Sequence, residues 1–137
     1  MQTFLPFSDF STSAKCLDYK RLGKQRVEAW QLLLIMVEDR VAWRNHPAFK
    51  MWDGYDYALA RYGIAICQEW KLRGYKDTLY DKFMHTPLPY ENTDYPPWLG
   101  NEEFHSSHRA ALLHKNFDFY SKFEWNEIPE LNYVWPV

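Results

Sequence analysis

The stretch from residue 18 to residue 28 constrains the fold most, because its polar side chains recur at the spacing of an α-helix. Neighbouring members of this set are three or four positions apart, so all of them share one helix face: Asp18, Arg21, Gln25 and Glu28. Between positions 15 and 26 there are five basic residues and one acid. The pattern predicts a helix from about Ala14 to about Glu38, bent at Gly23. Taken alone, it favours a solvated helix face over a site for a phosphate-bearing substrate.

Two more helices are predicted further along the chain. Large apolar side chains recur at helical spacing between residues 53 and 73, where Asp53 is a candidate N-cap and Gly74 suits the position after the helix end. A third helix is predicted from about His108 to about Phe119, capped by Ser106 or Ser107. The sequence therefore predicts a mainly α fold, with about three main helices in one domain over residues 1–137.

The remaining segments are predicted to be ordered loops. Residues 77–104 contain four prolines and many aromatic residues, which predicts a long irregular loop over the body of the domain. Residues 2–7 predict a short extended segment, because Pro6 blocks a helix there. The apolar character of this segment and of the tail, residues 128–136, indicates that both ends pack against the domain.

Composition narrows the classes of function. Aromatic residues make up 19% of the chain, which fits both a dense core and stacking on nucleobases. The net charge of −2 disfavours a general nucleic-acid binder. However, residues 1–50 carry eight Lys or Arg and five Asp or Glu, whereas residues 51–137 carry eight and 13. A local basic patch is therefore expected, and such a patch can bind a phosphate backbone.

Several chemistries find no support in the sequence. The chain has no phosphate-binding loop, no dinucleotide fingerprint and no GxSxG motif. Cys16 and Cys67 fit no metal or redox motif, and no signal peptide or membrane-spanning run is recognised. We therefore expect a reduced cytoplasmic protein, associated with the nucleoid or with the cytoplasm of a phage-infected host, that does not bind membranes.

The histidines leave three interpretations open. His46, His105 and His108 could bind zinc, although the chain has no HExxH motif. Alternatively, His105, His108 and Arg109 at a helix N-terminus favour an anion such as phosphate. The third interpretation makes them capping and surface residues.

A carboxylate pair is not expected, because about 15 Å of helix separates Asp18 from Glu28.

Motifs along most of the chain occur in an order that resembles a known family. They are Met-Gln-Thr-Phe-Leu-Pro at the start, Leu17-Asp18-Tyr19-Lys20-Arg21-Leu22-Gly23-Lys24-Gln25-Arg26-Val27-Glu28, Trp43-Arg44-Asn45-His46-Pro47, Leu72-Arg73-Gly74-Tyr75, Ser107-His108-Arg109 and Tyr133-Val134-Trp135-Pro136. This order resembles the pyrimidine-dimer DNA glycosylases, the endonuclease V-type repair enzymes of phages and bacteria, and especially the small members of that family. The likeness is specific at the first helix and at Asn-His-Pro, and weak in residues 77–104.

The resemblance implies a compact α-helical, monomeric enzyme that needs no cofactor or metal. It would act on double-stranded DNA, excise a damaged or modified pyrimidine and then possibly nick the strand as an AP lyase. In the family the N-terminal α-amine attacks the sugar C1′ and forms a Schiff base, assisted by a glutamate that corresponds to Glu28. The resemblance and the basic stretch together predict contacts to DNA from Lys20, Arg21, Lys24, Gln25, Arg26, Arg44, Asn45, His46, His105, His108 and Arg109.

Position 2 departs from the family pattern. Characterised members expose a threonine after the initiator Met is removed, whereas Gln2 stands here. Removal of Met before so bulky a residue is not expected, so the available α-amine is that of Met1. If Met1 is lost, Gln2 could cyclise and leave no amine. Two alternatives stay open beside the glycosylase. One is a non-catalytic nucleic-acid-binding protein on the same fold, and the other is a metal hydrolase that uses His46, His105 and His108.

Overall fold

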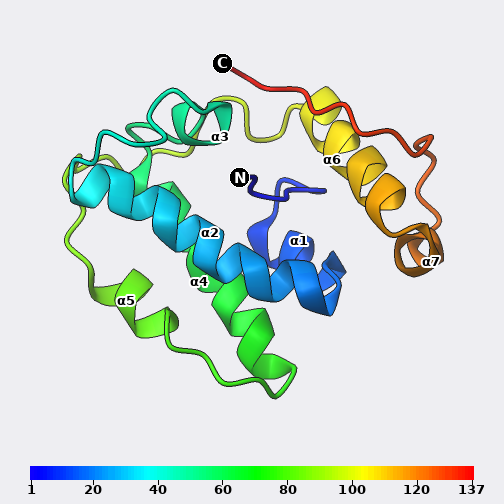
Figure 1. The fold of residues 1–137 in the computed structure, drawn as a ribbon, viewed down its shortest axis with the longest axis horizontal. Coiled ribbons are helices and arrows are strands. Elements are labelled where there is room, and N and C mark those ends of the chain that lie inside the picture. The colour runs from blue at the N-terminus through cyan, green and yellow to red at the C-terminus, as the bar shows by residue number, and fades with distance from the viewer.

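The computed structural model describes residues 1–137 and contains helices without any β-strand, which confirms the predicted mainly α fold. Two long helices cross at its centre (Figure 1). They are α2 (Tyr19–Val37) and α4 (Asp56–Leu72). The other elements are α1 (Phe10–Cys16), α3 (Pro47–Lys50), α5 (Tyr80–His85), α6 (Glu102–Lys115), α7 (Phe117–Tyr120) and the 3-10 turn η1 (Ser121–Phe123). No helix is long and apolar enough to cross a membrane.

The first predicted helix is two helices. The chain leaves the helical conformation at Leu17, whose φ of −73° and ψ of 138° are extended, and α2 begins at Tyr19. A contact from far along the chain stabilises this break. The hydroxyl of Tyr120 accepts a hydrogen bond from the Asp18 backbone N–H at 3.0 Å and donates one to the Asp18 carboxylate. The predicted continuity from Ala14 was therefore wrong, because a tertiary contact outweighs local helix propensity.

Gly23 lies within the continuous helix α2, where it allows α4 to approach closely. A Cβ built on Gly23 would stand 2.9 Å from the ring of Trp70, which is closer than real Cβ atoms come. The same relation recurs between Gly63 of α4 and Phe83 of α5, where a Cβ would stand 2.3 Å from the ring. Both glycines therefore serve helix packing.

The other predicted boundaries are partly correct. Gly74 follows α4 with a φ of +93°, and its N–H donates to Lys71 O at 2.9 Å, which confirms the predicted helix end. Asp53 does not cap α4, because that helix begins at Asp56. Asn101 rather than Ser106 or Ser107 caps α6, and its side chain accepts from Phe104 N–H at 3.0 Å. The predicted loop 77–104 includes the short helix α5.

The N-terminal segment runs through the middle of the molecule, between α2 and α6 (Figure 1). Residues 2–6 are buried, although they belong to no regular element. The C-terminal tail runs back along α6, where Glu130 N–H donates to Ala110 O at 3.2 Å and Val134 N–H donates to Ser107 Oγ at 3.1 Å. The prediction that both ends pack against the domain is confirmed.

Candidate active site

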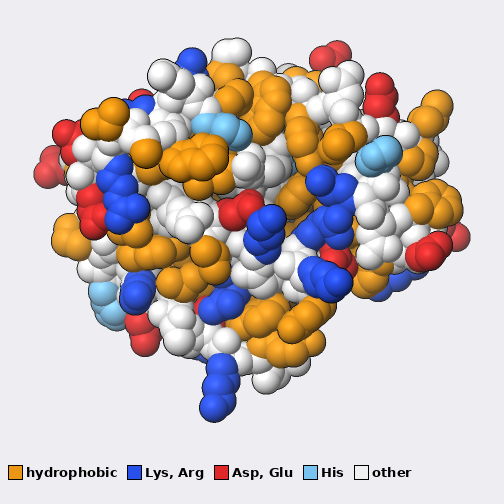
Figure 2. Space-filling model, viewed as in Figure 1, with side chains coloured by type: hydrophobic (Ala, Val, Ile, Leu, Met, Phe, Trp, Pro, Cys, Tyr) orange, Lys and Arg blue, Asp and Glu red, His pale blue; other side chains and the backbone are white.

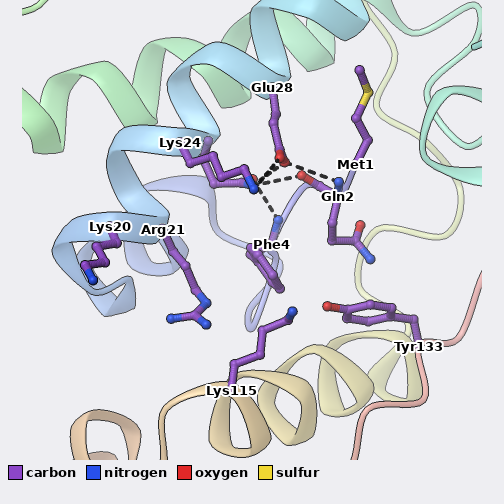
Figure 3. Close-up of a pocket in the computed structure, with 10 residues that line it drawn as sticks. Met1, Gln2, Phe4, Lys20, Arg21, Lys24, Glu28, Lys115 and Tyr133 are labelled. Atoms are coloured by element: carbon purple, nitrogen blue, oxygen red, sulfur yellow. Dashed lines mark hydrogen bonds and ion pairs between the residues drawn. The ribbon is translucent and has the colours of Figure 1, made fainter.

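A cavity of about 400 Å³ lies where the N-terminal segment, α2, the end of α6 and the tail meet. Figure 3 shows its lining side chains, half of which come from α2. The lining residues are Met1, Gln2, Phe4, Lys20, Arg21, Lys24, Gln25, Glu28, Lys115 and Tyr133. Three of the four residues of the polar stripe, Arg21, Gln25 and Glu28, therefore line a cavity, whereas Asp18 is buried against Tyr120.

Glu28 is the carboxylate of this cavity, and donors surround it. Its Oε2 accepts from the side-chain Nε2 of Gln25 at 3.0 Å and from the backbone N–H of Gln2 at 3.3 Å. Its Oε1 lies 3.7 Å from Lys24 Nζ. The Glu28 side chain is 14% exposed, so one edge of the carboxylate is reachable from the cavity. The contacts hold a negative charge beside the start of the chain.

Gln25 fixes the position of Glu28. Its Oε1 accepts from Phe4 N–H at 3.0 Å and from the hydroxyl of Tyr62 at 2.6 Å. Its Nε2 donates to Gln2 O at 2.8 Å and to Glu28. Four hydrogen bonds on a side chain that is almost fully buried leave no group for a phosphate. The sequence predicted that Gln25 contacts DNA, whereas the structure uses it to join the N-terminal segment to Glu28.

Tyr62 supports this arrangement from α4. Burial, followed by the negative charge of Glu28, raises the pKa of Tyr62 well above its usual range. Its hydroxyl therefore stays protonated and remains a donor. It lies within hydrogen-bonding distance of both Gln25 Oε1 and Phe4 O.

Cations reach the cavity from two sides. Lys20, Arg21 and Lys24 come from α2, and Lys115 extends from α6 across the cavity toward them (Figure 3). Neither Lys20 nor Lys115 has a carboxylate within 4.0 Å, whereas Arg21 pairs with Asp18 at 3.2 Å. Figure 2 shows Lys and Arg side chains gathered around an acidic one on this face. Lys115 was not among the residues predicted to contact DNA, because nothing local in the sequence links it to the distant basic stretch.

Arg26 and Arg44, both predicted to bind DNA, are engaged within the fold and do not line the cavity. Arg26 pairs with Asp77 at 2.7 Å and stacks over Trp70, with its guanidinium carbon 4.9 Å from the ring centroid. Arg44 binds the carbonyl of Ile35 at 3.3 Å near the end of α2. These contacts tie α2 to neighbouring loops, so the two guanidinium groups have structural partners already.

His105, His108 and Arg109 hold the N-terminal segment instead of facing solvent. His105 Nδ1 lies 2.8 Å from Leu5 O, and His108 Nδ1 accepts from Leu5 N–H at 3.0 Å. Arg109 Nη1 donates to Pro6 O at 2.7 Å. All three residues are buried. The predicted anion site at a helix start is not present, because α6 begins earlier and these residues lie inside it.

The two buried histidines of α6 are neutral. Burial lowers the pKa of His105, and it lowers the pKa of His108 to about 3. Gly100 N–H donates to His105 Nε2 at 2.9 Å, so the hydrogen of this ring sits on Nδ1 and points at Leu5 O. His46 lies elsewhere, at the N-cap of α3, and no three His, Cys, Asp or Glu side chains are grouped to hold a metal ion.

His46 lies near the start of the chain. Partial burial lowers its pKa, and the positive charge of the N-terminal ammonium lowers it further. Its Nδ1 accepts from Ala48 N–H at 3.0 Å, which caps α3. Asn45, the residue before it, is exposed. The Asn-His-Pro segment is thus brought to the side of the molecule where the chain begins.

The fold and the cavity define a small helical protein in which the chain's N-terminus, one carboxylate and several cations meet. The family model of the pyrimidine dimer DNA glycosylases matches residues 1–82, and the chain belongs to this family. The matched part includes Glu28 and the cations of α2, whereas Lys115 and Tyr133 lie outside it. No curated protein and no solved structure matches the chain.

Proposed function

We propose that this protein excises a damaged or modified pyrimidine from double-stranded DNA, with Glu28 and the N-terminal amine as its catalytic groups. One observation carries the proposal. The backbone nitrogen of Gln2 lies 3.3 Å from Glu28 Oε2, at the wall of a cavity rimmed by cations. Family membership supports glycosylase activity, and the basic rim supports a substrate with phosphates on both sides of the reacting sugar.

The reaction assigns a distinct task to each group. The neutral amine attacks C1′ of the target nucleotide, and the bond from C1′ to the base breaks. The base leaves with the bonding electrons and takes up a proton. Glu28 stabilises the positive charge that develops on the sugar and accepts a proton from the attacking amine. Opening of the sugar ring then gives a Schiff base, from which elimination of the 3′ phosphate cuts the strand.

Four cations at the rim of the cavity bind the phosphates that flank the target: Lys20, Arg21, Lys24 and Lys115. Lys20 and Lys115 have no carboxylate partner in the protein, so a phosphate is their natural counterion. They stand on α2 and α6, on two sides of the cavity. A strand held between them would pass over Glu28.

Substitution Glu28→Gln tests the catalytic role. Glutamine keeps an oxygen that can accept from Gln2 N–H, so we expect the fold and DNA affinity to be retained. We expect base release to fall by about 10²-fold or more, measured on duplexes that carry cyclobutane dimers or modified pyrimidines. Glu38→Gln, an exposed acid at the end of α2, is the matched control.

Three results of this experiment lead to different conclusions. Undiminished base release by the Glu28 variant would remove Glu28 from the mechanism. DNA binding by the wild-type protein without base release on any duplex would favour a non-catalytic binding protein. Borohydride treatment traps a Schiff base as a covalent complex. Base release by the wild-type protein without such a complex would retain the glycosylase activity and exclude the N-terminal amine as its nucleophile.

A further inference from the structure

Trp43 has an unusual backbone and an unusual exposure. Its φ is +70°, in the left-handed region that residues with a Cβ rarely adopt, and its side chain is 55% exposed. The ring is not buried deeply enough to account for the conformation through packing. A strained residue that presents a large aromatic surface to solvent points to a ligand.

The ring of His46 stands beside Trp43 in a fixed orientation. The two ring centroids are 5.6 Å apart, and the ring of Trp135 supports His46 from another side at 6.1 Å with an interplanar angle of 88°. His46 Nδ1 accepts from Ala48 N–H, so the hydrogen of the neutral ring sits on Nε2. No protein group accepts from that Nε2–H. His46 therefore offers both a ring face and a free donor.

These rings continue from the cavity to the surface. Tyr133 lines the cavity, and its ring centroid lies 5.6 Å from that of Trp135. Trp135 contacts His46, which in turn contacts Trp43. Figure 2 shows hydrophobic side chains gathered around a histidine over α3. Exposed Trp43 and partly buried His46 therefore stand at the outer end of a row of rings that begins in the cavity where the chemistry is proposed.

We propose that Trp43 and His46 form a stacking subsite for one unpaired nucleobase of the bound DNA. This inference rests on the proposed function, because a protein that acts on C1′ within a duplex must displace a base from the stack. An aromatic face replaces the stacking that this base loses. The His46 Nε2–H donates to a carbonyl oxygen or ring nitrogen on the edge of the base.

The test compares affinities on duplexes that lack one base at a time. Dissociation constants are measured in the Glu28→Gln background so that the DNA is not consumed. Four duplexes carry a stable abasic residue at the target, opposite it, or at the 5′ or 3′ neighbour, and a fifth is complete. We expect Trp43→Ala to weaken binding of the complete duplex about tenfold. On the one duplex that lacks the stacked base, we expect the loss to vanish.

Companion variants separate stacking from folding. Trp43→Phe keeps a ring and should retain most of the affinity, and His46→Asn keeps the cap of α3 but removes the ring and should weaken binding. Trp43→Gly relieves the left-handed backbone, so it should raise the melting temperature while it weakens binding. Tyr75→Ala, at a half-exposed ring beyond the end of α4, is the control and should leave the affinity for DNA unchanged.

An equal loss on all five duplexes, or no loss on any, would overturn the subsite. Either result is distinct from failure of the proposed function, which would appear as no base release by the wild-type protein. A duplex on which the loss vanishes identifies the stacked base as the target, its opposite partner or a neighbour.

Discussion

At the scale of single residues, one amide explains why Glu28 stands where it does. Gln25 uses all its hydrogen-bonding groups at once, and its partners come from the N-terminal segment, from α4 and from its own helix. An amide has both donors and an acceptor, so it can satisfy a carbonyl, an N–H, a hydroxyl and a carboxylate together. Neither Glu nor Leu of similar size has that combination.

We expect Gln25→Leu to lower both stability and activity. The substitution leaves Phe4 N–H and Gln2 O without partners in a buried place, whereas the Tyr62 hydroxyl keeps Phe4 O, and this should cost about 2–4 kcal/mol of unfolding free energy. Urea unfolding measures the loss. Tyr62→Phe removes only one donor and should cost about 1 kcal/mol. Equal stability of wild type and Gln25→Leu would show that these bonds are not needed.

The first residue supports a second prediction at this scale. In a chain that starts at Met1 the amine belongs to Met1, yet the nitrogen beside Glu28 is that of Gln2. A chain that begins at residue 2, with Gln2 not cyclised, would turn this nitrogen into the amine, so we expect it to form the borohydride-trapped complex faster than the chain with Met1. Mass spectrometry of the trapped peptide identifies the attached residue. A chain acetylated at its N-terminus should trap nothing.

The sequence identified some of these residues and not others, for physical reasons. The place of Glu28 on the polar face of α2 was predictable from its helical spacing, but only the family resemblance singled it out as a candidate catalytic group. The task of Gln25 was not, because its partners Phe4 and Tyr62 are 21 and 37 residues away. Lys115 was missed for the same reason. The sequence predicted His105 and His108 at a helix start, because Ser106 or Ser107 was the predicted cap. In the structure Asn101 caps this helix.

At the scale of elements, the N-terminal segment behaves as a strand without a sheet. Its backbone groups find side chains rather than a neighbouring strand: Gln25, Glu28, Tyr62, His105, His108 and Arg109. Buried backbone groups need partners, so α2, α4 and α6 together determine where the chain starts. The helices themselves were predictable from periodicity, but this segment's path was not, since it depends on contacts about 100 residues apart.

This anchoring predicts a dependence of stability on pH. The pKa of His108 is about 3 in the folded protein and about 6.5 when unfolded, so the unfolded chain binds the proton more readily. The contribution of neutral His108 to the free energy of unfolding is therefore complete above pH 6.5. It is lost as the pH falls toward 3, by up to about 1.4 kcal/mol per pH unit. The lowered pKa of His105 acts in the same direction.

Chemical denaturation at a series of pH values checks this prediction. His108→Asn keeps an acceptor for Leu5 N–H but does not titrate, so its unfolding free energy should decline less steeply below pH 6.5 than that of the wild type. His114→Asn, an exposed histidine near the end of the same helix, is the control. Identical acid limbs for wild type and His108→Asn would contradict the assignment.

At the scale of the whole molecule, charge is segregated. The net charge is −2, yet α2 and α6 direct four cations toward one cavity. The cations on α2 were visible in the sequence as an excess of Lys and Arg in the first 50 residues. The position of Lys115 depends on α6 lying across the cavity from α2, which composition does not reveal. Local field rather than net charge should therefore govern association with DNA.

Salt dependence of binding measures this local field. Lys20→Ala combined with Lys115→Ala removes two cations without carboxylate partners, so we expect the slope of log K against log salt to fall by about 2. Lys76→Ala combined with Lys82→Ala makes the same change of net charge away from the cavity and should leave the slope unchanged. Equal slopes for the two double variants would argue against a cavity-centred DNA interface.

The buried start of the chain also determines how the protein should be handled. An affinity tag fused before Met1 would have to leave through the cavity wall and would displace the groups that hold Gln2 against Glu28. The C-terminus ends at the edge of the molecule (Figure 1). We therefore expect an N-terminal tag to lower the proposed base release, whereas the same tag after Val137 would not have to pass between Gln2 and Glu28.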